Sequence, residues 1–340
     1  MMEQSIIEQL ERIYDLTIVD TPVQLGGLSN KNYAITTDKG KKVVKKYINN
    51  DIYRIEIEHA VLQHLEQKEF PYFAKPLVKK DKSHIEDQNI ATLVNIEGDY
   101  YALFEFKEGR PYQNTFEETL DAGRKLGLLH QALTDFDIEE KYGKHTKKVE
   151  ILDKWLLEIE SYDNLNDTEI NRAIEPTLDI IRTLKMKETS DENMVSHHFH
   201  ADYHLENIIY NDKGNVNAII DFEASHKSGQ RVIDLAFGAY NFSVGPTTDL
   251  IREMDLPKYL TFIKGYHETN PLSPTEIEKL VDALICHRAE YLSFYIEEAK
   301  KEKVVPQELK TKILETASHI AFLGRENEYI TFRTKKETSL

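Results

Sequence analysis

The sequence contains one cysteine and no long apolar run. Cys286 has no second cysteine with which to form an internal disulfide bond, which favours a reducing compartment. No apolar run approaches the roughly 18 residues that a membrane-spanning helix needs, and the acidic N-terminal segment lacks the apolar core of a secretory signal. We therefore expect a cytoplasmic protein without a membrane partner.

Basic residues are in the minority. The 340-residue chain has 43 Lys and Arg against 59 Asp and Glu, a formal net charge of −16. Such a surface repels nucleic acid, because nucleic-acid binding depends on neutralising phosphates with basic side chains. It favours cationic ligands over anionic ones, although a need for solubility explains the same charge. We expect no nucleic-acid partner.

The sequence shows no internal repeats or low-complexity segments, and its first hundred residues have mixed patterns. Apolar residues at helical spacing predict helices over residues 3–14 and 52–67. Runs of β-branched and aromatic residues predict strands over residues 16–20, 31–36, 41–48, 90–96 and 100–106. This part of the chain is expected to form a small sheet with one principal internal helix.

The pattern becomes mostly helical after Asn114. Thr115 and Glu118 have the spacing of a helix capping box, and Ser273 and Glu276 repeat it ahead of a long amphipathic stretch. Each pair predicts the start of a helix.

Residues 105–111 lie where the composition shifts, and their Gly and Pro suit a connector between two lobes. We therefore predict an α+β fold of two lobes. Residues 1–107 form a small antiparallel-sheet lobe with one main helix, and residues 108–340 form a larger, mostly helical lobe.

Residues 197–222 carry the strongest chemical signal. Two short β-type runs, around residues 208–210 and 216–220, flank the turn sequence Asn-Asp-Lys-Gly-Asn, which predicts a hairpin. Asp202 and Asn207 precede the first run and Asp221 follows the second, so we expect their side chains to converge. Two acids and an amide supply the hard oxygen ligands that suit Mg²⁺.

The spacing of these three residues matches a phosphoryl-transfer layout. Protein kinases have a catalytic Asp, a metal-binding Asn after a gap of four residues, and a second metal-binding Asp on the following hairpin. Asp202 and Asn207 have the same gap, and Asp221-Phe222 follows the predicted hairpin. A polar turn with solvated acids is the simpler alternative, but it does not account for the combination.

The sequence HADYHLEN followed by IIDFE resembles the signature of the aminoglycoside phosphotransferase and choline kinase superfamily. Residues 25–33 are similar to the nucleotide-loop region of type II homoserine kinases and methylthioribose kinases, and residues 232–236 also fit. The resemblance extends over about residues 20–270 and implies a bilobal protein-kinase-like fold. Ala201 departs from the pattern, which has glycine there. Because alanine disfavours positive φ, a loop that needs that conformation would put catalysis in doubt; we expect the change to be tolerated.

The resemblance implies roles for particular residues. Asp202 becomes the catalytic base, while Asn207 and Asp221 hold Mg²⁺. Lys45 takes the place of the lysine that binds the α- and β-phosphates, in competition with three other lysines of the same predicted strand. Glu58 is its expected ion-pair partner, with Glu56 as the alternative.

The remaining contacts to ATP are expected to use mostly the main chain. The loop over residues 26–30 lacks the glycine spacing of protein kinases, but its position suits a cover for the phosphates. Gly27 and the hydroxyl of Ser29 are the expected contacts. The resemblance places adenine against the main chain of Glu105 to Lys107.

Several other polar side chains have less certain roles. The histidines at 197, 198, 200 and 204 form a tract that resembles a metal site, but we expect His200 to brace the catalytic loop. His204 either does likewise or contacts substrate, and Glu223 reaches a second metal, a substrate amine or only solvent. Asp234 is expected to cap or brace a helix.

We therefore predict an ATP- and Mg²⁺-dependent kinase that phosphorylates a hydroxyl of a small, amine-bearing molecule. A homoserine-like amino alcohol is the first expectation, and amino sugars, aminoglycosides, choline-like alcohols and methylthioribose remain open. The alternatives are a protein Ser/Thr kinase of the same fold and a catalytically silent nucleotide-binding protein. The sequence does not reveal the oligomeric state or the preference between ATP and GTP.

Overall fold

The computed structural model describes most of the chain, as two compact units. The described residues are 2–26, 30–49, 51–80, 90–137, 147–148, 153–187, 195–245, 254–302 and 304–339. Unit 1 comprises Met1–Pro111, Asp135–Thr146 and Asn207–His226, and unit 2 comprises Tyr112–Thr134, Lys147–Glu206 and Lys227–Leu340. The lobe boundary near residue 108 stays a prediction.

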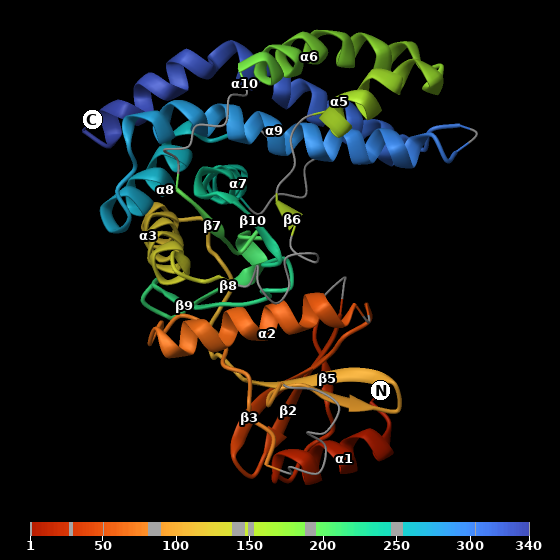
Figure 1. Ribbon diagram of the computed structural model, residues 1–340, viewed down its shortest axis with the longest axis vertical. Coiled ribbons are helices and arrows are strands. Elements are labelled where there is room, and N and C mark those ends of the chain that lie inside the picture. The colour runs from red at the N-terminus through yellow and green to blue at the C-terminus, as the bar shows by residue number, and fades with distance from the viewer. Residues whose placement is uncertain are drawn as a thin grey trace. The chain divides into compact units, whose positions relative to one another are not determined.

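Unit 1 contains an antiparallel sheet of five strands (Figure 1). Its strands are β1 (Val23–Gln24), β2 (Lys31–Thr37), β3 (Gly40–Lys46), β4 (Val94–Ile96) and β5 (Asp99–Glu105), in the order β1-β2-β3-β5-β4. Two expected strands are shorter than predicted. Residues 16–20 contribute only a single bridge from Ile18 to Thr37, and residues 90–96 pair only over β4. Pro22 follows the first segment and has no amide to continue a ladder.

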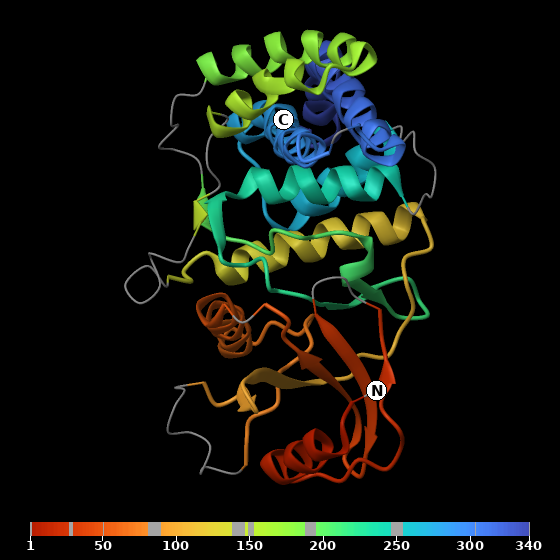
Figure 2. The same ribbon diagram turned by 90° about the vertical axis from the view of Figure 1, so that its right-hand side faces the viewer.

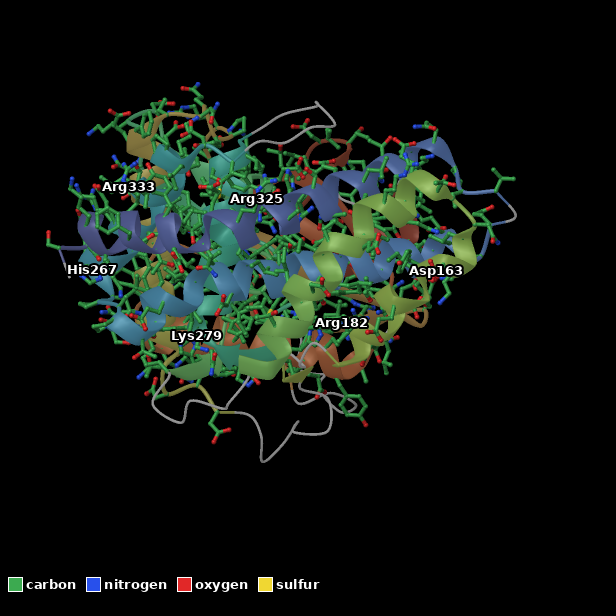
Figure 3. All side chains as sticks on the ribbon, turned by 90° about the horizontal axis from the view of Figure 1, so that it is seen from above. Asp163, Arg182, His267, Lys279, Arg325 and Arg333 are labelled. Atoms are coloured by element: carbon green, nitrogen blue, oxygen red, sulfur yellow. The ribbon has the colours of Figure 1, made fainter. Side chains whose placement is uncertain are left out.

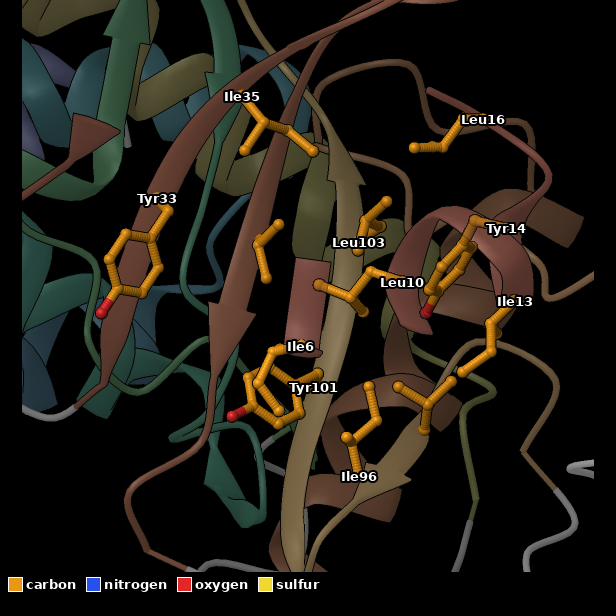
Figure 4. Packing of buried hydrophobic residues seen from close by; sticks show 12 residues of the cluster. Ile6, Leu10, Ile13, Tyr14, Leu16, Tyr33, Ile35, Ile96, Tyr101 and Leu103 are labelled. Atoms are coloured by element: carbon orange, nitrogen blue, oxygen red, sulfur yellow. The ribbon is translucent and has the colours of Figure 1, made fainter. Parts of the chain in front are cut away.

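Helix α1 (Gln4–Tyr14) packs its apolar side on this sheet. Figure 4 shows Leu10 of α1 facing Leu103 of β5, with Tyr14 beside it. Leu10 and Leu103 are completely buried, and burying one such side chain stabilises the fold by about 1.5–3 kcal/mol. The predicted apolar stripe of residues 3–14 is therefore the face that builds this core.

Helix α2 (Ile52–Gln67) has the predicted bounds. Its buried face is apolar at Ile55, Leu62 and Leu65, but it also contains Glu58, which is only 2% exposed. A carboxylate at such a position requires a charged or hydrogen-bonding partner.

The predicted hairpin is present, as β8 (Ile208–Tyr210) and β9 (Val216–Ile219), and it belongs to unit 1. Arg110 and Tyr210 exchange two main-chain hydrogen bonds of 2.8 and 2.9 Å, and the Ile219 amide donates to the Tyr72 carbonyl at 2.9 Å. Gly109, with φ of +155°, lets the chain approach closely, because a Cβ atom there would lie 2.4 Å from the Tyr210 carbonyl oxygen.

Unit 2 is mostly helical. Its helices are α3 (Phe116–Leu133), α5 (Asp153–Glu160), η2 (Ser161–Leu165), α6 (Thr168–Lys187), α7 (Arg231–Val244), α8 (Leu256–Thr269), α9 (Pro274–Ala299) and α10 (Gln307–Glu337). The short helix η3 (Leu205–Asn207) ends at the first residue of the unit 1 segment. A small sheet contains β6 (Lys147–Lys148), β7 (Ser196–His198) and β10 (Lys227–Gln230) in the order β6-β10-β7. Helix α8 packs on α3 and α7, and α9 packs on α7 and α10, as Figures 1 and 2 show.

The two predicted capping boxes have different outcomes. At α9, Ser273 and Glu276 form both bonds of the box, at 2.9 and 3.2 Å. At α3, Thr115 accepts from the Glu118 amide at 3.2 Å, but the Glu118 carboxylate accepts from the Gln113 amide instead. The second box is therefore only half formed.

The outer helices of unit 2 carry many charged side chains. Figure 3 labels Arg182 of α6, Lys279 of α9 and Arg325 of α10 among them. This distribution is typical of amphipathic helices that cover a core. Within the described ranges, none of the helices combines the length and apolar character needed to cross a bilayer.

Candidate active site

Lys45 is the buried lysine of strand β3. The strand lies between β2 and β5, where Lys45 pairs with Asn32 and Ala102. Its ammonium group lies 5.0 Å from the centre of the Tyr47 ring, as expected for two residues on one strand face. Only 6% of Lys45 is exposed.

The three competing lysines of β3 face other partners. Lys41 pairs with Glu108, Lys42 donates to the Lys39 carbonyl, and Lys46 pairs with Asp99. These contacts lie at or near the surface. Burial therefore distinguishes Lys45 from its neighbours.

Lys45 is surrounded by carboxylates. Its Nζ lies 2.8 Å from Glu58 Oε1, 3.2 Å from Asp221 Oδ1 and 3.9 Å from Glu223 Oε2. The expected ion pair with Glu58 is present. Burial alone would lower the pKa of Lys45, but the charges of Glu58 and Asp221 raise it above the ordinary value, so the ammonium stays protonated.

A row of buried hydrogen bonds that no sequence pattern predicted supports this strand. The Tyr47 hydroxyl lies 3.1 Å from His59 Nε2, and His59 Nδ1 lies 2.7 Å from the Thr92 hydroxyl. Burial lowers the pKa of His59 to about 3, so the ring is neutral at physiological pH. These hydrogen bonds fix the Tyr47 ring beside Lys45 without adding another charge.

Asn207 and Asp221 stand at the two ends of the β8–β9 hairpin. The Asn207 carbonyl accepts from the Ile220 amide at 2.9 Å, which holds the two ends together. Asp221 has a φ of +63°, a left-handed conformation that is uncommon outside glycine and is often found at functional sites. The hairpin thus places the two predicted metal-binding residues at one edge, within unit 1.

Glu223 contacts Asn30, the last residue of the predicted phosphate loop. The side-chain amide of Asn30 donates to Glu223, while Asn30 Oδ1 accepts from the Ile48 amide at 3.1 Å. Gly27 and Ser29 of the same loop lie outside the described residues. The only feature of the sequence that indicates this contact is an asparagine directly before a predicted strand.

Glu105 and Lys107 lie at the end of β5. The Glu105 amide donates to the Lys75 carbonyl at 2.8 Å, and the side chains of Glu105 and Lys107 form an ion pair at 3.0 Å. Their predicted contact with adenine stays a prediction.

Asp202 belongs to unit 2, in the loop that follows β7. Its amide donates to His200 Nδ1 at 3.3 Å, so His200 braces the loop as expected. His204 Nε2 lies 3.5 Å from Asp202 Oδ2, and the Asp202 side chain is 41% exposed. The convergence of Asp202 on Asn207 and Asp221 stays a prediction.

Asp234 braces this loop as well as a helix, which is a wider role than the expected one of capping or bracing a helix. Its carboxylate accepts hydrogen bonds from the amides of His200 at 3.2 Å and Ala201 at 3.0 Å, and from His130 Nε2 at 3.0 Å. The bonds reach residues more than thirty positions away, which local sequence patterns do not reveal. Burial raises the pKa of Asp234 to about 6.

Ala201 has a φ of +63°. The loop therefore adopts the left-handed conformation at position 201, which is strained for alanine and unstrained for glycine. An alanine in the left-handed region costs about 1–2 kcal/mol, and the Ala201 amide is held there by its bond to Asp234.

The donor set fits Mg²⁺ better than zinc. Within the described part of the chain, no group of three or more His, Cys, Asp or Glu residues is arranged to hold a metal ion. Burial lowers the pKa of His197 to about 4, and its ring packs on His130 at 5.0 Å, so both behave as core histidines. Mg²⁺ commonly takes one or two protein carboxylates and completes its shell with phosphates and water. Asp221 and Asn207 meet that need, and Lys45 suits the phosphates of ATP.

A comparison with protein families gives one clear match. The model of the family described as "Phosphotransferase enzyme family" matches residues 21–272. This range nearly coincides with the resemblance inferred over residues 20–270. No curated protein matches the sequence.

Solved structures with the same fold are numerous. An amicoumacin kinase in complex with AMP-PNP, Ca²⁺ and Ami is 18% identical, with 94% of this chain and 93% of that chain covered and a TM-score of 0.67. A microcompartment-associated aminopropanol kinase is 14% identical, with 97% and 98% covered and a TM-score of 0.68. The choline kinase LicA from Streptococcus pneumoniae is 16% identical, with 94% and 97% covered and a TM-score of 0.55. These similarities confirm the predicted α+β, protein-kinase-like fold.

Proposed function

Because the chain belongs to the phosphotransferase enzyme family, we propose that it transfers the γ-phosphoryl group of ATP to a hydroxyl of a small, amine-bearing molecule in the cytoplasm, with Mg²⁺. The observation that carries the proposal is the buried ammonium of Lys45, held by Glu58 at 2.8 Å and Asp221 at 3.2 Å. Such a lysine–glutamate pair, together with a metal-binding aspartate, is the arrangement that protein kinases need for activity.

The residues of unit 1 bind the phosphates. Lys45 supplies a fixed positive charge for the α- and β-phosphates, and Glu58 orients it. Asn207 and Asp221 hold Mg²⁺, which when bound neutralises charge on the phosphate oxygens. Asp221 contacts Lys45 in this structure, so the same carboxylate serves as counterion to the lysine and as metal ligand.

Asp202 positions the acceptor hydroxyl. It accepts a hydrogen bond from the acceptor hydroxyl and directs that oxygen toward the γ-phosphorus. The new oxygen–phosphorus bond forms as the bond to the β-phosphate oxygen breaks, ADP leaves, and the hydroxyl proton passes to Asp202. Because this transition state is loose, position matters more than basicity. The amides of His200 and Ala201, bound to Asp234, fix the loop that carries Asp202.

An amine on the acceptor is supported by two observations. The net charge of −16 favours cationic ligands. Two structures of the same fold are, by name, an aminopropanol kinase and a choline kinase, and both named compounds join a hydroxyl to a positively charged nitrogen.

A phosphorylation screen with labelled ATP tests the proposal. The panel contains amino alcohols, amino sugars and aminoglycosides, and the variants are Asp202→Ala and, as a matched control, Asp212→Ala in the exposed turn of the hairpin. We expect at least one acceptor to be phosphorylated, a loss of about 10²–10⁴-fold in kcat for the first variant, and no loss for the second. ATP binding without phosphorylation of any acceptor would favour the catalytically silent alternative.

A further inference from the structure

Arg288 of α9 is held between two aromatic rings. Its guanidinium carbon lies 5.2 Å from the centre of the Tyr240 ring and 5.6 Å from that of Tyr291. Its Nη2 donates to the Thr316 hydroxyl at 3.1 Å, and that hydroxyl itself donates to the Lys312 carbonyl at 2.7 Å. The side chain is therefore fixed in one orientation.

The charge of Arg288 has no counterion among the residues that the structure describes. No carboxylate oxygen of the described residues lies within 4.0 Å of its nitrogens, and its buried Nε has no hydrogen-bond partner among them. Arg231, by contrast, is bound to both oxygens of Glu276 at 2.6 and 2.9 Å. Arg288 is partly exposed, and an arginine with no described carboxylate beside it is unexpected in a chain with 59 acidic residues.

Helix α7 relates Arg288 to the catalytic loop. Asp234, Phe237 and Tyr240 follow one another at three-residue intervals, so they lie along one side of the helix. Asp234 holds the loop of Asp202, Phe237 packs on His287 at 4.4 Å, and Tyr240 packs on Arg288. Six residues of helix span about 9 Å, which is the scale of a small metabolite.

Tyr291 lies within the electric field of both groups. Burial raises the pKa of its hydroxyl to about 12, the charge of Asp202 adds to the rise, and the guanidinium of Arg288 opposes it. The Tyr291 ring also packs on His287 at 4.9 Å, and His287 packs on Phe237, so Arg288 borders the same aromatic cluster that follows Asp234 along α7.

We propose that Arg288 binds a carboxylate of the acceptor while the acceptor hydroxyl lies at Asp202. This inference rests on the proposed function and narrows it: the acceptor is a small hydroxy amino acid rather than a simple amino alcohol or an aminoglycoside. A single planar guanidinium matches a carboxylate in two parallel hydrogen bonds. A phosphate monoester carries nearly two charges and three acceptor oxygens, which one arginine satisfies poorly.

Matched acceptors test this directly. L-Serine, L-threonine and L-homoserine are each compared with their own carboxamide, which keeps the amine and the hydroxyl but removes the negative charge. Phosphorylation kinetics are measured for the wild type, Arg288→Gln, Arg288→Lys and the control Arg325→Gln, an exposed arginine of α10. Binding of the same six compounds is measured by calorimetry with Asp202→Asn, with and without Arg288→Gln. Thermal unfolding confirms that each variant is folded.

We expect the wild type to prefer one acid over its amide by about 10–100-fold in kcat/KM, the range for hydrogen bonds to a charged group. Arg288→Gln should abolish that preference through KM, Arg288→Lys should restore part of it, and Arg325→Gln should leave it unchanged. Equal use of acid and amide by the wild type would overturn the inference even if the lysine and glutamine variants failed to fold.

The outcomes separate this inference from the proposed function. Phosphorylation without a preference for the acid overturns the role of Arg288 and leaves the kinase assignment intact. Binding of an acid that depends on Arg288, without phosphorylation, supports the carboxylate site and contradicts the kinase assignment. If none of the six compounds is phosphorylated or bound, the carboxylate site is overturned, and the wider acceptor screen decides the kinase assignment.

Discussion

Replacing Ala201 by glycine should stabilise the protein, although the same replacement destabilises most proteins. Ala201 has a φ of +63° in the loop that carries Asp202. A residue with a Cβ atom is strained in this region, whereas glycine adopts it freely. The two bonds from His200 and Ala201 to Asp234 do not involve the Ala201 side chain, so they remain in the variant.

The expected gain is the difference between two terms. Relief of the left-handed strain contributes about 1–2 kcal/mol, and the greater freedom of glycine in the unfolded chain costs about 0.5–1 kcal/mol. The net effect on the free energy of unfolding is a gain of roughly 0–1.5 kcal/mol, centred near 0.75 kcal/mol. Ala201→Val should have the opposite effect, because a β-branched residue is a clear outlier at positive φ.

Urea unfolding monitored by circular dichroism provides the measurement. The matched control is Ala173→Gly, in the interior of α6 within the same unit, where the loss should be about 1 kcal/mol. We expect the free energy of unfolding to rise in Ala201→Gly and to fall in Ala173→Gly, and this difference in sign would identify the strained loop. If Ala201→Gly lowers the midpoint as much as Ala173→Gly does, the strain argument is wrong.

Three further variants address the charged residues of the site. Glu58→Gln removes the nearest carboxylate from the buried Lys45 ammonium and leaves Asp221, and kcat/KM for ATP should fall by about 10²-fold, because removing one partner of a buried ion pair costs about 3–5 kcal/mol; unchanged steady-state kinetics would contradict this. Asp221→Asn should raise the Mg²⁺ concentration needed for half-maximal activity, which a titration at fixed ATP measures, while the exposed Asp212→Asn should not. Asp234 has a pKa raised to about 6 by burial, above its unfolded value of about 3.9, so the stability it provides is fully present below pH 4 and is lost as the pH rises through 6. Between pH 4 and pH 7 the wild type should therefore lose roughly 2 kcal/mol of unfolding free energy relative to Asp234→Asn, and a difference that does not change with pH would refute the raised pKa.

Local patterns in the sequence predicted much of the fold. Helix α2 has the predicted ends, and the β8–β9 hairpin forms around the predicted turn. Both depend on neighbouring residues, through helical periodicity and turn preferences. The match to the phosphotransferase enzyme family confirms the family resemblance and the class of enzyme, a phosphotransferase.

Residues whose role depends on a distant partner could not be predicted. The Asp234 carboxylate is defined by amides at positions 200 and 201, and Asn30 by its bond to Glu223. The strand expected at residues 16–20 has a suitable composition but gains only one bridge. In each case the decisive energy comes from tertiary contacts, which periodicity does not encode.

The pairing of Arg110 with Tyr210 and of Tyr72 with Ile219 joins the β8–β9 hairpin to the sheet-bearing half of the chain, although most of its sequence neighbours belong to the other half. The four residues that we propose bind ATP and Mg²⁺ therefore all belong to unit 1, whereas the proposed catalytic base Asp202 belongs to unit 2. An engineer could exchange the helical portion for that of a homologous kinase and carry over Lys45, Glu58, Asn207 and Asp221 intact. Such a chimera would test new acceptors while keeping the same residues for ATP and Mg²⁺.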